Sequence, residues 1–171
     1  MKGYLAGSIF YEGDVLRNTA WAEKIRKAIP SIDLYSPIEN TDINGAEGKK
    51  KFAGSKEIVD GDMARLNNTD VLIACLDGDV IPCGTACECG IMYEKIKQGA
   101  HKYIVGICTD NRQCYLTHSE AKNIGGAASL GEQQYSYQNI FVTGVVKAGG
   151  KLFYNIDDAV EYLKEISDEF K

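Results

Sequence analysis

Glu88 is the residue whose type and position most clearly suggest chemistry. It follows the apolar run 71–76, which predicts a strand buried on both faces. It also lies near the start of residues 85–98, where apolar residues recur with helical spacing. The carboxylate is therefore expected one turn inside a helix that begins at the carboxyl end of a central strand. Open parallel sheets bind their ligands at that edge, so Glu88 is a candidate catalytic group.

Two interpretations of Glu88 fit this short segment. Thr85 and Glu88 have the spacing of a capping box, in which both side chains accept hydrogen bonds from backbone N–H groups at a helix start. Alternatively, Gly84 and Gly90 allow a ligand to approach closely. The positive amino end of the helix then favours the ionised carboxylate that a nucleophile requires. The segment alone leaves both the structural and the catalytic interpretation open.

Asp62 is the second carboxylate of interest. Residues 55–66 have helical spacing, and their apolar stripe includes Ile58, Val59 and Leu66. Asp62 lies on the same face as that stripe, where an ionised carboxylate is costly unless it is paired or hydrogen-bonded. The alternative is a boundary residue whose carboxylate reaches water. Because the next strand follows this helix directly, both carboxylates can reach one pocket.

These carboxylates belong to an alternation of strands and helices along the chain. Expected strands lie at residues 3–6, 32–35, 71–76, 103–107 and 139–142. Expected helices lie at residues 17–29, 55–66, 85–98 and 156–170. This rhythm predicts an α/β fold in which a single domain, residues 1–171, forms a doubly wound, flavodoxin-like parallel sheet of five strands flanked by helices. Residues 36–54 read as a polar loop, and residues 109–138 have no convincing period.

Charge and length exclude several classes of protein. The chain of 171 residues carries 19 basic and 24 acidic side chains, a net charge of −5. That balance argues against binding nucleic acid or an anionic membrane surface. The amino end lacks the long apolar region of a signal peptide, and no apolar run approaches the roughly 18 residues of a membrane span. We therefore expect a cytoplasmic protein with no nucleic-acid or membrane partner.

Cysteine usage points to reduced thiols rather than to a disulfide framework. Of the six cysteines, Cys83, Cys87 and Cys89 cluster in sequence, but without the CxxC spacing of structural zinc sites. His101 and His118 have no ligand-like neighbour, and no Cys–His pair suggests an activated thiol. No metal and no cofactor are expected.

Several segments resemble one known family. They are YLAGSIF at residues 4–10, Asp62 on a helix before DVLIA at residues 70–74, and GTACECG at residues 84–90. With NIFVTG at residues 139–144, their order resembles that of the nucleoside 2-deoxyribosyltransferases and the related 2-deoxynucleoside 5-phosphate N-hydrolases. The match covers nearly the whole chain and is weakest in the two long polar stretches.

The resemblance implies cleavage of the N-glycosidic bond of a 2-deoxynucleoside. Glu88 would attack the anomeric carbon, a covalent deoxyribosyl-enzyme would form, and a second nucleobase would take the sugar with retention. A 2-deoxy sugar suits this route because it lacks the electron-withdrawing 2-hydroxyl. Asp62 would handle the proton of the nucleobase or orient the sugar. Asn139 looks like the asparagine that a neighbouring subunit lends to the site, which implies a homo-oligomer.

Further substrate-binding positions are expected in the loops at this edge, and the small-molecule partners would be 2-deoxynucleosides and nucleobases. The positions are Gly7, Ser8, Phe10, Tyr11, Asp79 and Gly84. Phe10 or Tyr11 would stack on the base, an interaction worth roughly 1–3 kcal/mol, with ordinary packing as the alternative.

The chain also departs from the family. Many relatives have an aspartate two residues before the glycine of the glutamate motif, where this chain has Pro82. The role of that aspartate is vacant or passes to Asp79 or Asp77. The best-known transferases end in an aromatic residue whose terminal carboxylate meets the sugar, whereas this chain ends in an acidic helix through Phe170 and Lys171.

Two alternatives to the transferase remain open. One is a hydrolase of deoxynucleoside monophosphates, which would need a phosphate site built from Ser8, the Gly7 backbone, and Ser129 or Ser136. The other is a non-catalytic nucleotide-binding module, because a fold does not fix an activity.

Overall fold

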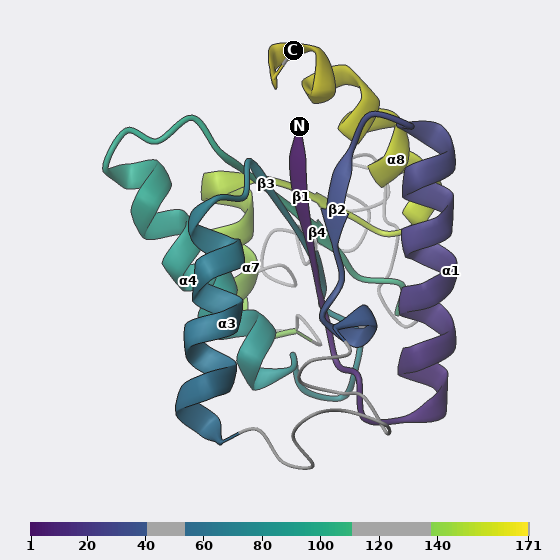
Figure 1. Ribbon diagram of the computed structural model, residues 1–171, viewed down its shortest axis with the longest axis vertical. Helices are drawn as coiled ribbons and strands as arrows, with labels where there is room; N and C mark the ends of the chain where they lie inside the picture. Colours follow the sequence, from purple (N-terminus) through teal and green to yellow (C-terminus); the bar gives the residue numbers. More distant parts are fainter. Residues whose placement is uncertain (41–53, 111–137, 171) are drawn as a thin grey trace, which may run out of the picture.

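A computed structural model describes residues 1–40, 54–110 and 138–170 of the chain. Its centre is a sheet of five parallel strands in the order β2-β1-β3-β4-β5 (Figure 1). The strands are β1 (Lys2–Ala6), β2 (Asp33–Tyr35), β3 (Val71–Cys75), β4 (Tyr103–Ile107) and β5 (Gly150–Phe153). The expected doubly wound α/β fold is confirmed.

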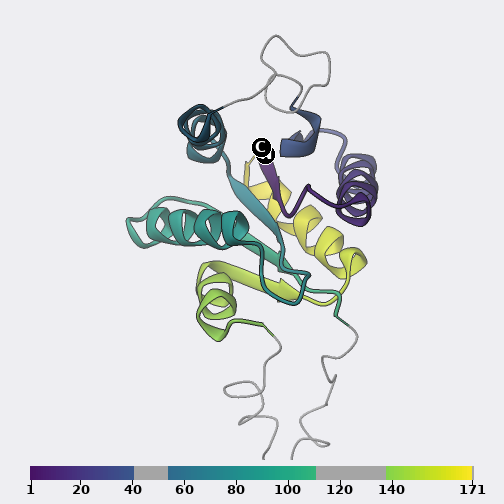
Figure 2. The same ribbon diagram turned by 90° about the horizontal axis from the view of Figure 1, so that it is seen from below.

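Helices cover both faces of the sheet. Seen from the carboxyl ends of the strands, α1 (Glu12–Ala28) and α8 (Ile156–Ser167) lie on one face (Figure 2). The other face is covered by α3 (Ser55–Asn67), α4 (Cys83–Lys97) and α7 (Ile140–Gly149). Two 3-10 turns, η1 (Pro37–Glu39) and η2 (Asp168–Phe170), follow β2 and α8.

The central strand β3 is buried along its whole length, as its apolar sequence predicts. Because successive side chains point to opposite faces, Ile73 packs in the core beneath α1 and α8, and Leu72 packs beneath the other three helices. Tyr4 on β1 lies opposite Leu72 in the parallel register and belongs to the same core. The ring of Tyr4 is therefore directed to the face that α4 covers.

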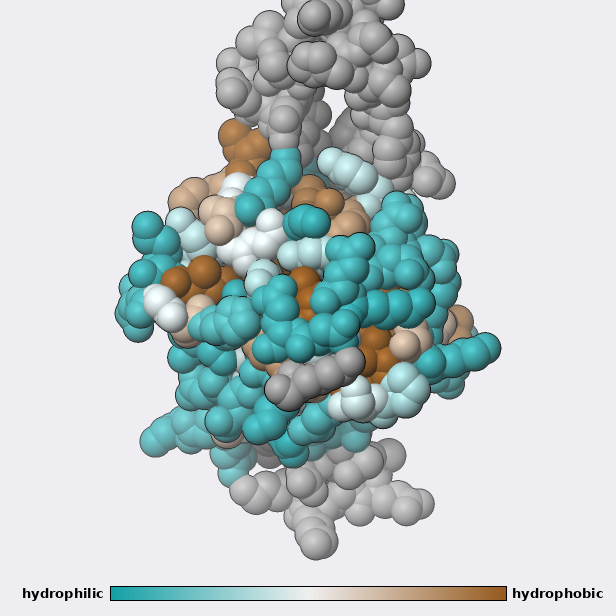
Figure 3. All heavy atoms as spheres, turned by 90° about the horizontal axis from the view of Figure 1, so that it is seen from above, coloured by the Kyte–Doolittle hydropathy of each residue, from teal (hydrophilic) through white to brown (hydrophobic). Residues whose placement is uncertain are grey.

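Both ends of the described chain lie at the amino ends of the strands, away from the edge where α1 and α4 begin (Figure 1). The ring of Phe170 stacks on His101 with a centroid distance of 4.8 Å, and Tyr103 donates a hydrogen bond of 2.7 Å to Glu169. Figure 3 shows that hydrophilic residues dominate this end of the molecule. The carboxyl-terminal segment thus packs at the edge opposite Glu88.

The expected fifth strand at residues 139–142 is wrong. Asn139 instead caps α7, because its side-chain oxygen accepts hydrogen bonds from the N–H groups of Phe141 at 3.0 Å and Val142 at 3.2 Å. The fifth strand is β5, which begins at Gly150. A Cβ atom at Gly150 would lie 1.9 Å from the backbone oxygen of Ile104, so glycine is required where β5 meets β4.

Other boundaries differ by a few residues. Helix α1 begins at Glu12 rather than at residue 17, and α4 begins at Cys83 rather than at residue 85. The expected apolar stripe of α3 is buried only in part: Leu66 is 1% exposed, whereas Ile58 is 38% and Val59 57% exposed. Residues 41–53 and 111–137, which contain most of the two expected loops, lie outside the described residues. Within the described ranges, no helix is both long and apolar enough to cross a membrane.

Candidate active site

Glu88 contacts the sheet rather than its own helix. The phenolic hydroxyl of Tyr4, in the middle of β1, donates a hydrogen bond of 2.6 Å to Oε1 of Glu88. The capping-box interpretation is wrong, because α4 begins three residues earlier than that box requires and Thr85 is buried inside the first turn. The residue before the helix is Pro82, which has no capping side chain. Glu88 is therefore a partly buried carboxyl group at the carboxyl edge of the sheet.

Burial dominates the electrostatics of Glu88. Burial raises the pKa of this carboxyl, the hydrogen bond from Tyr4 lowers it and the charge of nearby Asp62 raises it, and the net result is a pKa of about 7. The amino end of the helix was expected to favour the ionised form, but loss of hydration outweighs that effect. A carboxyl that titrates near neutral pH can be an ionised nucleophile or a proton carrier, depending on its neighbours.

Asp62 lies on α3, partly buried, beside the end of β2. The hydroxyl of Tyr35 donates to Oδ1 of Asp62 at 3.3 Å, and the side-chain amide of Asn40 donates to the same hydroxyl at 3.0 Å. Burial raises the pKa of Asp62, and the hydrogen bond from Tyr35 opposes that rise. Asp62 is thus a partly exposed residue whose carboxylate also accepts a hydrogen bond within the chain.

The two carboxyl groups and the two tyrosines interact with one another. We call these four residues, Tyr4, Tyr35, Asp62 and Glu88, the Glu88–Asp62 cluster. The rings of Tyr4 and Tyr35 are 5.1 Å apart, and Tyr4 interacts with both carboxyl groups. Burial, followed by the charge of Glu88, raises the pKa of Tyr4, so its hydroxyl remains a donor. The sequence predicted that the two carboxyl groups converge, but it did not identify either tyrosine. The available signal was that successive side chains of a strand point to opposite faces of the sheet, which assigns each strand tyrosine to one face.

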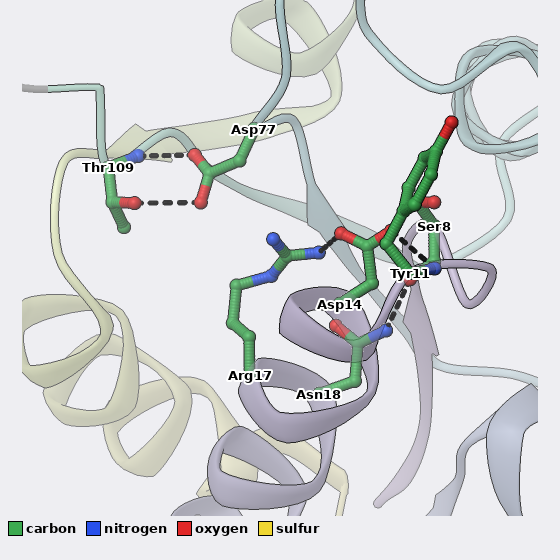
Figure 4. A network of polar contacts seen from close by, with 7 residues as sticks. All are labelled: Ser8, Tyr11, Asp14, Arg17, Asn18, Asp77 and Thr109. Atoms are coloured by element: carbon green, nitrogen blue, oxygen red, sulfur yellow. Dashed lines mark hydrogen bonds and ion pairs between the residues drawn. The ribbon is translucent and has the colours of Figure 1, made fainter.

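The turn after β1 holds Gly7 and Ser8 against α1. The side chain of Asn18 donates to the backbone oxygen of Ser8 at 2.8 Å (Figure 4). A Cβ at Gly7 would lie 3.1 Å from that of Cys75. Asp14 accepts hydrogen bonds from the Ser8 side chain and from Arg17. Burial opposes ionisation of Asp14, but these bonds outweigh it and lower the pKa of the carboxyl.

The aromatic pair that follows this turn is exposed. Phe10 is 87% and Tyr11 77% exposed, at the start of α1. Within the described residues, ordinary packing does not account for them. Stacking of either ring on a nucleobase stays a prediction.

The loop between β3 and α4 contains the two aspartates considered as replacements for the missing family residue. Asp77 accepts two hydrogen bonds from Thr109, at 2.6 Å from the backbone N–H and 2.7 Å from the hydroxyl (Figure 4). It therefore ties the end of β3 to the end of β4. Asp79 is exposed on the same loop. Gly84 is exposed as well, and a Cβ there would meet open space, so no contact within the described chain requires glycine.

Asn139 is exposed at the amino end of α7, where its side chain serves as the cap. Its neighbours Ile140 and Phe141 are 50% and 78% exposed. No contact between Asn139 and Glu88 of the same chain is found among the described residues, so the structure does not bring this predicted site residue into the cluster.

A cavity of about 230 Å³ lies beside the cluster. It is lined by Leu34, Tyr35, Ser36, Glu39, Asn40 and Arg65. Neither Glu88 nor Asp62 lines it, so it borders the cluster only through Tyr35. Among the described cysteines, Cys83 and Cys87 are exposed on α4. Nowhere in residues 1–40, 54–110 and 138–170 do three or more potential metal ligands group together.

Comparison with known proteins places this geometry in a family. Among curated protein sequences, none matches the chain. A crystal structure of a conserved protein from Enterococcus faecalis V583 is 32% identical, with a TM-score of 0.76, and the match covers 96% of this chain and 97% of that one. A 2-desoxiribosyltransferase from Leishmania mexicana has the same fold at 18% identity and a TM-score of 0.58, covering 96% of this chain and 97% of that one. Residues 4–156 match the model of the nucleoside 2-deoxyribosyltransferase family, and the chain belongs to that family.

Proposed function

We propose that this protein is a nucleoside 2-deoxyribosyltransferase that moves deoxyribose between nucleobases through a covalent deoxyribosyl-Glu88. The observation that carries the proposal is the hydrogen-bonded, mutually coupled arrangement of Tyr4, Glu88 and Asp62 at the carboxyl edge of the sheet. Membership of the family supplies the reaction class. The cluster supplies the two carboxyl groups that a retaining glycosyl transfer requires.

The chemistry follows from one proton shared between two carboxyl groups. The reactive form has Glu88 ionised and Asp62 protonated. Glu88 attacks the anomeric carbon while Asp62 donates its proton to the departing base, so the C–N bond breaks as the C–O bond forms. In the second step the acceptor base attacks the same carbon, Asp62 takes the proton of the new base, and Glu88 leaves as a carboxylate. Two displacements give overall retention.

Tyr4 controls the charge on Glu88 in this scheme. Its hydrogen bond stabilises the ionised carboxylate before the first step. In the second step the ester breaks, and the same hydrogen bond stabilises the negative charge that develops on Glu88. Water would compete with the acceptor base for the deoxyribosyl-enzyme. A partly buried ester on Glu88 limits that competition, which favours transfer over hydrolysis.

The charges around the cluster favour a neutral nucleoside over a nucleoside monophosphate. A phosphate dianion requires cationic or N–H donors, but the described groups around this edge include the carboxylates Asp62, Asp79 and Glu88. Arg17 is paired with Asp14 at 2.9 Å, and the Ser8 hydroxyl also bonds to Asp14. On the described residues the hydrolase therefore ranks behind the transferase; Ser129 and Ser136, its other expected phosphate donors, lie outside them.

The active form is proposed to be a homo-oligomer. Asn139 and the exposed apolar pair Ile140 and Phe141 lie together at one end of α7. Exposed apolar side chains next to a candidate site residue favour contact with a second subunit. In that arrangement Asn139 contributes to the site of the neighbour, and each monomer alone is incomplete.

Product analysis tests the proposal. The protein is incubated with deoxyinosine, with and without free adenine, and separately with deoxynucleoside monophosphates. Adenine-dependent formation of deoxyadenosine supports the transferase. Release of deoxyribose phosphate from the monophosphates without exchange would assign the hydrolase, and no turnover with bound nucleoside would assign a binding module. The Glu88→Gln variant should lose exchange, whereas Glu94→Gln, an exposed glutamate on the same helix, should retain it.

A further inference from the structure

Tyr35, the last residue of β2, has a hydroxyl whose hydrogen-bonding direction is fixed by its partners. The atom of Asn40 that faces Tyr35 is its amide nitrogen, which can only donate, so at 3.0 Å the Tyr35 oxygen accepts from it. The single phenolic proton is then left for Oδ1 of Asp62, at 3.3 Å. Asn40 and Tyr35 thus form a directed chain of hydrogen bonds that ends on the proposed acid–base group.

Two side chains lie against the ring of Tyr35. The ring of Tyr4 lies 5.1 Å away, tilted by 54°, and the guanidinium of Arg65 lies 5.1 Å from the ring centroid. Burial raises the pKa of Tyr35, so the hydroxyl stays protonated and continues to donate. A side chain whose ring has two packing neighbours, with one donor aimed at one carboxylate oxygen, is arranged to fix the orientation of that carboxylate.

We infer that Tyr35, supported by Asn40, is a positioning residue that holds one oxygen of Asp62 so that the other exchanges a proton with the nucleobase. The inference rests on the proposed function and extends it to the residues that set the acid–base step. Tyr35 acts through Asp62 and forms no bond with the reacting atoms.

The groups that face Asp62 come from several elements. Tyr35 of β2 donates to it, whereas the nearby hydroxyl of Tyr4 of β1 donates to Glu88. The charge of Asp62 in turn raises the pKa of Glu88 of α4. Arg65, on the same helix as Asp62, lies over the ring of Tyr35. Loss of the Tyr35 hydroxyl removes one donor to the charged form, so Asp62 keeps its proton to higher pH.

The experiment compares Tyr35→Phe with the wild type in the base-exchange assay across pH. We expect kcat to fall by about tenfold with little change in KM, because orientation of the acid is lost while binding is kept. The pH profile should move to higher pH by about one unit, the size that a hydrogen bond to a charged group allows. Asn40→Ala should shift the profile in the same direction by less, and adding it to Tyr35→Phe should add little further loss.

Tyr103→Phe is the matched control. It also removes a strand phenol that donates to a carboxylate, Glu169, but at the opposite edge of the sheet. Its kcat and pH profile should equal those of the wild type. Carboxyl 13C NMR of Asp62 gives a second readout that does not depend on turnover, and the titration of Asp62 should move to higher pH in Tyr35→Phe.

The outcomes separate the inference from the function on which it rests. A wild type that exchanges bases, together with a Tyr35→Phe variant of unchanged kcat and pH profile, would overturn the positioning role alone. An unchanged Asp62 titration in Tyr35→Phe would overturn it as well. A wild type without base exchange would remove the proposed function and this inference together. If Tyr35→Phe fails to fold, Asn40→Ala tests the same hydrogen-bond chain from its other end.

Discussion

Tyr4 and Glu88, separated by 84 positions in the chain, are joined by a hydrogen bond of 2.6 Å from the centre of the sheet to the first turns of α4. The bond exists because Tyr4 faces the same side of the sheet as α4 and is fully buried there. It gives a carboxyl group in a poorly hydrated site one strong donor. The relationship links the fold directly to the charge state of the proposed nucleophile.

Replacing Tyr4 with phenylalanine should slow the reaction by roughly 10- to 100-fold in kcat. Without the phenol, the pKa of Glu88 rises further, so less of the carboxylate is ionised at neutral pH and the acidic limb of the pH profile moves to higher pH. Steady-state kinetics from pH 5 to 9 measure both effects. An acidic limb that stays in place would contradict the role assigned to Tyr4.

The protein should become less stable as pH rises from about 4.5 to about 7. Burial raises the pKa of Glu88 to about 7 from its usual 4.5, so the folded state holds a proton that the unfolded chain releases in this window. The stabilisation is complete below 4.5 and lost above 7, and it amounts to at most about 3 kcal/mol. Asp62, whose pKa is also raised, acts in the same direction.

Urea unfolding at pH 5 and pH 8 measures this dependence. The wild type should lose stability between the two values, and Glu88→Gln should lose less because its side chain does not ionise. Glu94→Gln, on the exposed side of the same helix, should behave like the wild type. Equal pH dependence in the wild type and Glu88→Gln would show that Glu88 titrates normally.

Subunit mixing should reveal whether Asn139 serves a neighbouring site. Asn139→Ser keeps a residue that caps α7, so the fold is retained while the amide is lost. If the site is shared, Asn139→Ser and Glu88→Gln should each be inactive alone. Mixed dimers would contain one site with both native residues, giving about a quarter of wild-type activity after random exchange. No recovery after exchange, verified by mass spectrometry of mixed oligomers, would place Asn139 outside the shared site.

The two aspartates of the β3–α4 loop should respond differently to substitution. Asp77→Asn weakens the two bonds to Thr109 and should lower the free energy of unfolding by about 1–2 kcal/mol. Asp79→Asn leaves those bonds intact, so it should change KM for the nucleoside with little effect on stability. Thermal unfolding and kinetics of both variants test this division. A stable Asp77→Asn variant with altered KM would reverse the assignment.

Much of the fold could be predicted from the sequence because buried parallel strands have continuous apolar sequences. The run 71–76 predicted β3, with Glu88 on the helix that follows it. The convergence of Glu88 and Asp62 was expected because the helix that carries Asp62 directly precedes the same strand. The run 139–142 misled because a short apolar segment fits a strand or a helix equally well. The signal that decides is Asn139, a strong helix cap.

The parts of the site that were missed depend on contacts distant in sequence. Tyr4 and Tyr35 read as ordinary strand residues, and only the sheet order that places β1 between β2 and β3 brings them to Glu88 and Asp62. The capping-box interpretation failed for a related reason. Local spacing predicted a bond within the helix, whereas the fold supplies Glu88 with a donor from another element.

Trapping the glycosyl-enzyme tests the central claim most directly. The protein is mixed with deoxyinosine without an acceptor base, quenched rapidly in acid, and digested for peptide mass spectrometry. The account predicts a mass increase of one deoxyribosyl group on Glu88, which disappears when adenine is added and is absent from Glu88→Gln. Base exchange that proceeds with no adduct on Glu88, or that persists in Glu88→Gln, would contradict the assignment of Glu88 as the nucleophile.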